Sequence, residues 1–310
     1  MGRKIYVGAD GGGTKTAICA LGCLPGNQVF SCQGASMNYN VIGVEKAAVH
    51  FAEAMSRLPM ARGMEIAAVA IGDPSIDDLV PSPLTGQFLN RVRQLVPPLS
   101  MCPIYVASDV YMTLYGMTGG EPGAIMVSGT GSMGLAQDPK GRLHVVAGWG
   151  RLIEGEGSGY FIASRGLRAA LRYYEGTGPK TVLLEEMKRY FGIQDPRDFV
   201  LRYYADSTAF PDVAGFAKVV GDAAGQDEEA KKILLECGDI LVTGMCTLLQ
   251  KAGLTDCKVG VYGSVLLENS LVRKVFERGV LEAWPRVTIM VPKLKPEAAA
   301  LQYSMEKEGV

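Results

Sequence analysis

Short apolar runs separated by polar turns dominate the first third of the chain. Runs of this length predict buried strands, whereas apolar positions at helical spacing predict amphipathic helices. Strands are predicted at residues 4–9, 16–21, 28–34, 66–72 and 104–108, and helices at 44–58 and 86–96. Three successive strands followed by strand–helix units predict an α/β fold, with a mixed sheet and helices on its faces.

The same order of elements begins again near residue 124. Strands are predicted at 124–127, 135–137, 143–147, 259–262 and 286–291, and helices at 270–279 and 297–307. The stretch 158–252 is predicted to be mostly helical, with breaks at 176–179, 195–196 and 210–211. A strand, a Gly-rich loop and a second strand thus occur twice, which indicates an architectural repeat. Since 310 residues are also long for one core, we predict two domains, 1–117 and 118–296, that hinge near 115–122.

The first Gly-rich loop is GADGGGTKT at residues 8–16. Glycines leave backbone amides bare, and bare amides beside a hydroxyl and a lysine bind phosphate oxygens. Asp10, at the end of the preceding strand, is placed to hold Mg²⁺ through water. The alternative is an ordinary Gly-rich hairpin turn, but three glycines exceed what a tight turn needs. The candidate phosphate-binding residues are Gly11, Gly12, Gly13, Thr14 and Lys15.

The second Gly-rich loop, GTGSMG at residues 129–134, matches the pattern GxGxxG. A dinucleotide-binding loop would open a long helix, but the sequence that follows, LAQDPKG, cannot form one. A second phosphate loop made by Gly129, Thr130, Gly131 and Ser132 is the better interpretation. A plain hairpin turn is the alternative. Two such loops on two domains would hold one triphosphate across a cleft.

Asp109 follows the predicted strand 104–108, between the two loops in sequence. An Asp at the carboxyl end of a sheet strand faces the ligand crevice of an α/β fold. Phosphoryl transfer to an alcohol needs a base that orients the nucleophile and accepts its proton, and Asp109 is our candidate. From its position alone, Asp109 could equally be the N-cap of a helix at 110–118, and the two roles can coexist.

A cluster with one Trp and several acidic residues follows at 148–159, GWGRLIEGEGSG. A flat apolar ring beside carboxylate acceptors suits a sugar, which has an apolar ring face and hydroxyl groups. A mobile acidic loop is the alternative interpretation. The candidate sugar-binding residues here are Trp149, Gly150, Glu154 and Glu156.

Composition narrows the class of protein further. A net charge of −1 gives no support to binding of nucleic acid or acidic membranes. The seven Cys are scattered without a CxxC pair and there are only two His, which disfavours a zinc site and suits a reducing cytoplasm. No signal-peptide stretch and no apolar run long enough to span a bilayer occurs. We therefore expect a soluble cytoplasmic protein.

Taken in order, these motifs resemble those of the actin-like sugar kinases, in the branch of N-acetylglucosamine kinases and BadF/BadG/BcrA/BcrD-type ATPases. The matching pieces are DGGGTKT (10–16), GASMNYNVIG (34–43), SD (108–109), SGTGSMG (128–134), GWGRLIEGEGSGY (148–160) and YGSV (262–265). The resemblance implies two ribonuclease-H-like (actin-like ATPase) domains with an ATP cleft between them. It also implies that the last helix, within 297–310, packs back on the N-terminal domain.

The resemblance also assigns roles to single residues. It implies that Asp10 lies near Mg²⁺, that Asn38 contacts the sugar and that Asp109 is the catalytic base. Gly263 and Ser264 match the glycine pair of the family's adenosine site, with Ser264 replacing the second glycine. The chain departs from the family at Glu154 and Gly155, where the kinases have Gly and Asp.

Two hypotheses follow. The first is a kinase that uses ATP and Mg²⁺ to phosphorylate a hydroxyl of an amino sugar such as N-acetylglucosamine. The second is an ATPase that acts as a conformational activator or regulator of a partner protein. The activator branch of the family carries a Cys-ligated iron–sulfur cluster, and the cysteines with that motif context are missing here. We expect a homodimer with a small-molecule sugar substrate.

Overall fold

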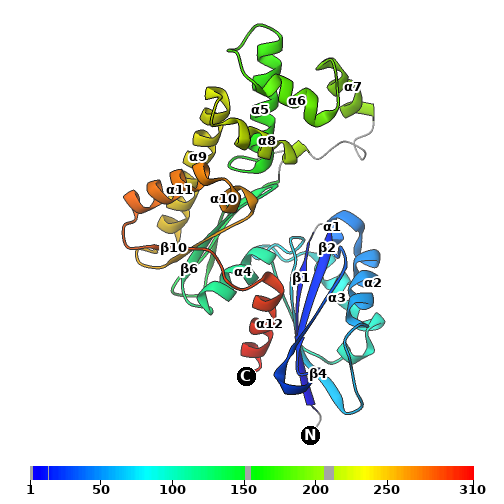
Figure 1. Ribbon diagram of the computed structural model, residues 1–310. Helices are drawn as coiled ribbons and strands as arrows, with labels where there is room; N and C mark the ends of the chain where they lie inside the picture. Colours follow the sequence, from blue (N-terminus) through cyan, green and yellow to red (C-terminus); the bar gives the residue numbers. More distant parts are fainter. Residues whose placement is uncertain (1–2, 13, 151–154, 206–212) are drawn as a thin grey trace. The chain divides into compact units, whose positions relative to one another are not determined.

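The computed structural model of the protein describes residues 3–12, 14–150, 155–205 and 213–310. The chain divides into two compact units (Figure 1). The first comprises Met1–Glu121 and Pro292–Val310, and the second comprises Pro122–Val291. The sequence analysis predicted domain boundaries at 117/118 and 296/297.

The first unit is built on a five-stranded mixed sheet in the order β3-β2-β1-β4-β5. The strand β2 pairs antiparallel with both β1 and β3, whereas β4 runs parallel to β1 and to β5. The strands are β1 (Arg3–Gly11), β2 (Lys15–Leu21), β3 (Val29–Ala35), β4 (Met64–Gly72) and β5 (Ile104–Ala107).

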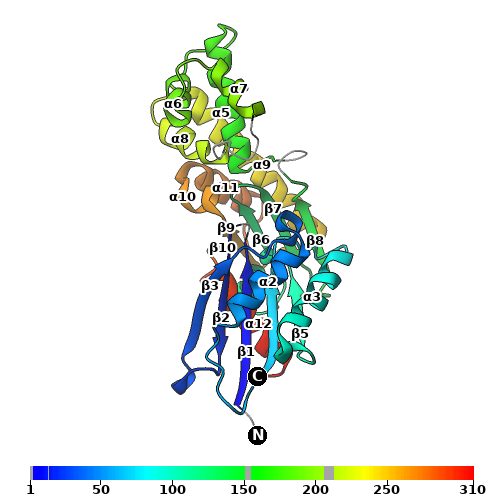
Figure 2. The same ribbon diagram turned by 90° about the vertical axis from the view of Figure 1, so that its right-hand side faces the viewer.

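Helices cover both faces of this sheet (Figures 1 and 2). On one face, α2 and α3 enclose the main core of the unit, to which β1 contributes Ile5, Val7 and Ala9. On the other face α12 packs on β1, β4 and α4. The bounds are α1 (Tyr39–Ile42), η1 (Pro25–Asn27), α2 (Val44–Met55), α3 (Pro83–Leu95), η2 (Pro97–Leu99), α4 (Asp109–Thr118) and α12 (Pro296–Lys307).

The contact between α12 and β1 depends on Gly8. A Cβ atom at this position would lie 2.1 Å from the backbone nitrogen of Leu301 and 2.2 Å from the carbonyl oxygen of Glu297. Only a residue without a side chain lets the helix backbone approach the strand this closely. The glycine in β1 is therefore one reason why the last helix can pack on the N-terminal unit.

The second unit repeats this topology. Its sheet has the order β10-β9-β6-β7-β8. Read from β8 to β10, this order matches the order β3-β2-β1-β4-β5 of the first unit strand by strand. The pairs β6–β7 and β7–β8 are antiparallel, and β9 is parallel to β6 and β10. The predicted architectural repeat is confirmed. The strands are β6 (Gly123–Ser128), β7 (Ser132–Gln137), β8 (Leu143–Ala147), β9 (Lys258–Tyr262) and β10 (Thr288–Met290).

A helical segment lies between β8 and β9 of the second unit. The predicted breaks at 176–179 and 195–196 separate α5, α6 and α7, and the break predicted at 210–211 lies outside the described residues. The helices of the second unit, of which the last two follow β9, are α5 (Gly159–Tyr174), α6 (Leu183–Phe191), α7 (Arg197–Ala205), η3 (Val213–Gly215), α8 (Phe216–Ala223), α9 (Glu228–Ala252), α10 (Ser264–Glu268) and α11 (Ser270–Ala283).

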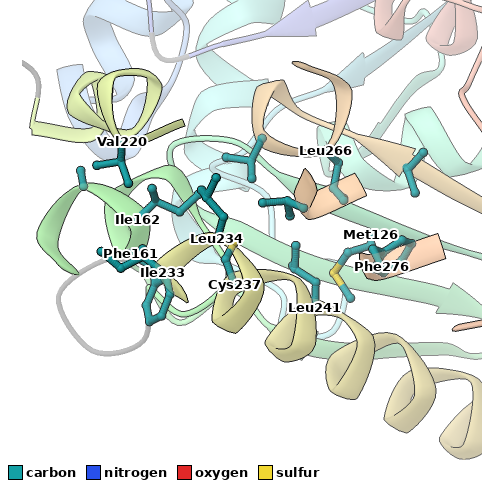
Figure 3. Packing of buried hydrophobic residues seen from close by; sticks show 14 of the residues in the cluster. Met126, Phe161, Ile162, Val220, Ile233, Leu234, Cys237, Leu241, Leu266 and Phe276 are labelled. Atoms are coloured by element: carbon teal, nitrogen blue, oxygen red, sulfur yellow. The ribbon is translucent and has the colours of Figure 1, made fainter. Parts of the chain in front are cut away.

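The long helix α9 is the centre of the second core. Its residues Leu234, Cys237 and Leu241 pack among apolar side chains from the sheet, α5 and α11 (Figure 3). By length and composition alone α9 could cross a membrane, and it is the one described helix for which this holds. A buried core helix passes the same test, and the packing of α9 is that of a core helix.

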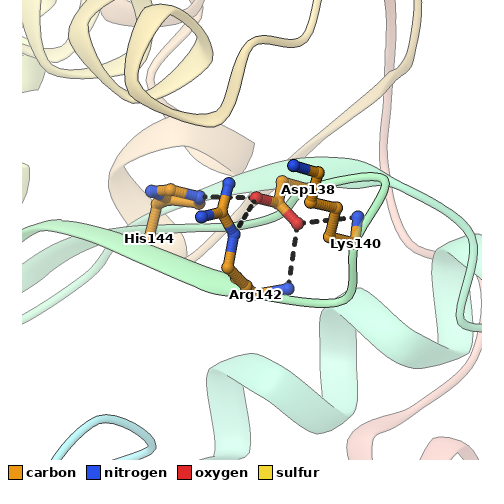
Figure 4. Close-up of polar contacts among 4 residues, drawn as sticks. All are labelled: Asp138, Lys140, Arg142 and His144. Atoms are coloured by element: carbon orange, nitrogen blue, oxygen red, sulfur yellow. Dashed lines mark hydrogen bonds and ion pairs between the residues drawn. The ribbon is translucent and has the colours of Figure 1, made fainter.

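The hairpin between β7 and β8 is held by one buried carboxylate, Asp138 (Figure 4). Asp138 is only 3% exposed. It accepts hydrogen bonds from the backbone nitrogens of Lys140 (2.8 Å) and Arg142 (2.9 Å). The Arg142 side chain (2.8 Å) and the His144 ring (3.2 Å) reach its second oxygen. Burial acts to raise the pKa of Asp138, but these hydrogen bonds outweigh it and hold the pKa below its usual range.

Replacing Asp138 by asparagine is therefore expected to lower the melting temperature. Because the pKa of Asp138 is depressed in the native state, the difference in melting temperature between this variant and wild type is fully present above about pH 4, the ordinary range of Asp. It shrinks as the pH falls through the lowered native pKa. Thermal melts at neutral pH and at about pH 3 measure this, with the exposed Asp256→Asn as control. A difference that is equal at both pH values would contradict the prediction.

Candidate functional site

The first Gly-rich loop is a β-hairpin, as the sequence predicts. Asp10 pairs with Ala17 across β1 and β2, and the Gly12 nitrogen donates to the Lys15 carbonyl at 2.8 Å to close the turn. Thr14 and Lys15 are exposed, so the hydroxyl and the ammonium group are available to a ligand. Gly13 lies outside the described residues.

Asp10 sits at the end of β1 beside several other charged groups. Burial and, after it, the carboxylates of Asp109, Glu297 and Asp73 together raise the pKa of Asp10 to about 7, whereas Lys15 acts to lower it. Like charges around a buried carboxylate disfavour its ionised form. The structure thus brings Asp10 and Asp109 together, and it adds two carboxylates that the sequence analysis did not select.

The helix-cap interpretation of Asp109 is wrong. Ser108 is the N-cap of α4, because its Oγ accepts the hydrogen bond from the Tyr111 nitrogen at 2.9 Å. The predicted strand 104–108 accordingly ends one residue early, at Ala107. Asp109 is the first residue of the helix, and its Oδ1 accepts from the Val110 nitrogen at 2.9 Å. Burial raises the pKa of Asp109. With the cap supplied by its neighbour, the carboxylate is left for another role.

Asp73, directly after β4, is a site residue that the sequence analysis missed. It is 2% exposed, and its Oδ1 accepts from the Ser75 nitrogen at 2.7 Å. Its Oδ2 is buried without a hydrogen-bond partner, at a point only 1.9 Å from where a Cβ on Gly11 would lie. Burial raises the pKa of Asp73 to about 7. The signal that could have found it is the one that found Asp109, an Asp directly after a buried parallel strand.

Ser36 connects Asn38 to the first loop, and Ser75 holds the Asn38 side chain. The Ser75 hydroxyl donates to the side-chain oxygen Oδ1 of Asn38 at 2.9 Å. The backbone nitrogen of Asn38 donates to Ser36 Oγ at 3.2 Å. The Ser36 hydroxyl in turn donates to the Gly12 carbonyl at 2.7 Å. The residue predicted to contact a sugar is therefore fixed to the loop predicted to bind phosphate.

The second Gly-rich loop is also a hairpin. Ser128 and Ser132 face each other as the last pair of β6 and β7, and the Gly129 nitrogen donates to the Gly131 carbonyl at 2.8 Å. No helix follows the loop, which confirms that the GxGxxG match does not mark a dinucleotide site. The Gly159 nitrogen, at the start of α5, donates to the Gly129 carbonyl at 2.7 Å and anchors the loop.

Gly263 brings the end of β9 against this loop. Its φ is +88°, and a Cβ there would lie 2.3 Å from the Ser128 carbonyl oxygen, so both conformation and space require glycine. A cavity of about 660 Å³ within the second unit is lined by Gly129, Thr130 and Ser264 together with residues of α8, α9 and α11. This volume is within the range of small-molecule sites, roughly 300–1,000 Å³. Ser264 of the predicted adenosine site and Gly129 and Thr130 of the predicted phosphate loop thus line one cavity.

The predicted sugar-binding cluster is described only in part, since Glu154 lies outside the described residues. Trp149 is 73% exposed and Gly150 has a φ of +86°. The carbonyl of Glu156 accepts a hydrogen bond from the Ser132 hydroxyl, which ties the cluster to the second loop. Glu156 and Ser132 also line a cavity of about 740 Å³ beside α9.

The carboxylates of the first unit fit a hydrated Mg²⁺. Oxygen donors are the ligands Mg²⁺ prefers, and it usually keeps several waters rather than entering a complete protein cage. Among the described residues, no group of three or more Asp, Glu, His or Cys is placed to ligate a metal directly. Asp73 Oδ2, which lies next to Gly11 of the first loop, is a buried acceptor to which no described group donates a hydrogen bond. Asp10 would hold the ion through water.

Two α/β units of equivalent topology, each with a Gly-rich hairpin, define the ribonuclease-H-like fold of the actin-like ATPases. The family model of the BadF/BadG/BcrA/BcrD ATPase family matches residues 7–301, so the chain belongs to this family. The resemblance found in the sequence is confirmed.

Individual relatives agree with this assignment. The chain is 24% identical over 296 residues to the N-acetylmuramic acid/N-acetylglucosamine kinase of Clostridium acetobutylicum, covering 94% of both chains. It is 23% identical over 318 residues to the N-acetyl-D-glucosamine kinase of Dictyostelium discoideum, covering 97% of both chains. A solved structure from Chromobacterium violaceum, described as a candidate N-acetylglucosamine kinase, superposes with a TM-score of 0.73 at 23% identity, covering 96% of this chain and 97% of that one.

Proposed function

We propose that the protein is an ATP-dependent kinase that phosphorylates a hydroxyl of an amino sugar, N-acetylglucosamine or a relative of it. The observation that carries this proposal is the position of Asp109. Its carboxylate is not needed as a helix cap, its pKa is raised by burial, and it lies beside Asp10 of the first phosphate loop. The names of the relatives from Clostridium and Dictyostelium, both amino-sugar kinases, support the substrate class.

In this proposal Asp109 orients the sugar hydroxyl and accepts its proton. The hydroxyl oxygen forms a bond to the γ-phosphorus of ATP as the bond to the β–γ bridging oxygen breaks, which releases ADP. Backbone amides of the two Gly-rich loops, other than those of Gly12 and Gly129 that close the turns, and the Lys15 ammonium stabilise the phosphoryl oxygens, because positioning and electrostatics dominate such transfers. Mg²⁺, when bound, neutralises phosphate charge, and Asp10 would hold it through water. Asn38 binds the sugar, and Gly263 and Ser264 contribute to the adenosine site.

A coupled assay of ADP release over a panel of amino sugars tests this function. Release that depends on N-acetylglucosamine, N-acetylmuramic acid or glucosamine supports the kinase. Slow release that no sugar stimulates would contradict it, and would favour an ATPase that regulates a partner protein.

Binding of ATP with Mg²⁺ is expected to raise the melting temperature. A ligand that binds only the native state adds about 2.7 kcal/mol of stability at a concentration of 100 Kd. Thermal shift and calorimetry at millimolar ATP, with and without Mg²⁺, measure this effect. If both methods show no response, the proposed nucleotide site is wrong.

A further inference from the structure

The loop at residues 73–80, which follows β4, is fixed on one side to the start of α4. The Asp78 carboxylate accepts two hydrogen bonds from Ser108, one from the backbone nitrogen at 2.8 Å and one from the hydroxyl. Ser108 is the N-cap of α4 and directly precedes Asp109. Asp78 therefore holds the stretch of backbone from which the proposed base projects.

The same loop is fixed on its other side to the segment that carries the proposed sugar-binding residue. The Ser75 hydroxyl donates to Asn38 Oδ1 at 2.9 Å. The Ser75 carbonyl accepts from the Tyr39 hydroxyl at 3.3 Å and from the Asn40 side chain at 3.4 Å. One short loop of the first unit thus connects the residue proposed to bind the sugar with the start of the helix that carries the proposed base.

Stability alone does not explain the contact between Asp78 and Ser108. Leu79 and Val80, the next two residues, are 51% and 63% exposed, so apolar packing does not hold this end of the loop. The contact also has an electrostatic cost, because the Asp78 carboxylate acts to raise the pKa of Asp109, and like charges at a partly buried site repel. What the carboxylate provides is one acceptor oxygen for each of the two Ser108 donors. A costly local contact of this kind is typical of functional sites.

We propose that Asp78 is a positioning residue for phosphoryl transfer, which fixes the Ser108 backbone so that Asp109 meets the hydroxyl of the bound sugar. The proposal rests on the proposed function, because it concerns the base of that reaction. The hydrogen bond from the Ser108 nitrogen positions the backbone, whereas the hydroxyl belongs to the helix cap. A misplacement of about 1 Å can reduce a rate by roughly 10²-fold, so the loss of this hydrogen bond should be visible in turnover.

The test compares the turnover of wild type, Asp78→Ala, Asp78→Asn and Asp77→Asn at a pH where turnover no longer changes with pH. Asp78→Ala removes both hydrogen bonds, and we expect kcat to fall roughly 10–100-fold. The KM for the sugar should change little, because Asn38 stays bonded to Ser75. Asp78→Asn keeps an oxygen that can accept from the Ser108 nitrogen, so its kcat should stay within roughly threefold of wild type.

Asp77→Asn is the matched control. Asp77 is the exposed neighbour of Asp78, and its Oδ1 accepts from the nitrogens of Leu79 at 2.8 Å and Val80 at 3.0 Å. An asparagine can accept the same hydrogen bonds, so this variant removes one carboxylate charge from the loop without removing a contact. We expect it to turn over as wild type does.

A double-mutant cycle separates positioning from general destabilisation. If Asp78 acts through Asp109, Asp78→Ala should not reduce the residual turnover of Asp109→Asn any further, because the group that it positions is gone. A further loss in that background as large as the loss in wild type would overturn the inference.

Three other results would also overturn it. They are an Asp78→Ala variant that keeps kcat within roughly threefold of wild type, an Asp78→Asn variant that loses as much as Asp78→Ala, and loss of the fold in Asp78→Ala, seen by circular dichroism. If wild type releases ADP in response to a sugar, these results concern Asp78 alone. If wild type does not, the proposed function has failed, and the inference fails with it.

Discussion

Replacing Asp109 by asparagine is expected to reduce the turnover of sugar phosphorylation by roughly 10²–10⁴-fold, the usual contribution of a general base. The asparagine side chain has the same shape and can still accept the hydrogen bond from the Val110 nitrogen. The start of α4 and the binding of ATP should therefore be preserved. Steady-state kinetics and calorimetry with ATP on the same preparation separate the two effects.

Ser108→Ala is the matched control for Asp109→Asn. It removes the helix cap, whose loss typically reduces stability by about 1 kcal/mol, but leaves the carboxylate in place. We expect it to lower the melting temperature with little change in turnover. If Asp109→Asn instead keeps near-normal turnover and behaves like Ser108→Ala, Asp109 is only a structural residue of α4.

The pH profile gives a second readout for Asp109. A base must be ionised, and burial raises the pKa of this group above the ordinary range of Asp. The turnover number of wild type should therefore rise with pH through the raised pKa and then level off. In the residual activity of Asp109→Asn the part of this acidic limb that belongs to Asp109 should be absent, and only titration of the other raised carboxylates, Asp10 and Asp73, should remain.

Replacing Gly8 by alanine is expected to destabilise the first unit by roughly 3 kcal/mol, at the upper end of the effects of overpacking. The added Cβ would lie 2.1 Å from the backbone of Leu301, which no rotation of a side chain can relieve. The helix α12 must then shift away from β1. For a domain of this size, 1 kcal/mol corresponds to about 2–4 °C in melting temperature.

Gly86→Ala is the control for Gly8→Ala. Gly86 lies within α3, and a Cβ there would meet nothing within 4 Å. Alanine is favoured over glycine inside a helix, so this variant should be as stable as wild type or more stable. A Gly8→Ala variant with the same melting temperature as Gly86→Ala would show that the approach of α12 to β1 is not close enough to need glycine.

The sequence predicted those features that depend on local pattern. The two hairpins follow from glycine runs between apolar strands, and the position of Asp109 follows from the strand before it. The assignment of the helix cap failed because Ser108 and Asp109 are both good N-caps. Which of them caps is decided by where β5 ends, and element boundaries are the least certain part of a sequence-based prediction.

The missed carboxylates have a different explanation. Asp73 lies after a strand just as Asp109 does, but its burial depends on the close approach of Gly11, which no local pattern reveals. Glu297 is more than 280 positions from Asp10 in the sequence, and only the return of α12 brings the two together. A contact of this kind follows from topology rather than from the residues nearby.

The discontinuous first unit also constrains how the protein is made. Domains generally fold as units during synthesis, with the N-terminal domain first. Here the sheet formed by β1 to β5 lacks one of its covering helices until residues 296–307 have been translated. Until then, Tyr6 and Ala68 have no Leu301 to pack against. The second unit, which is continuous from Pro122 to Val291, is complete earlier than the first. The ribosome therefore releases a chain whose N-terminal half finishes folding last, and a chaperone that protects apolar surface would act on that half.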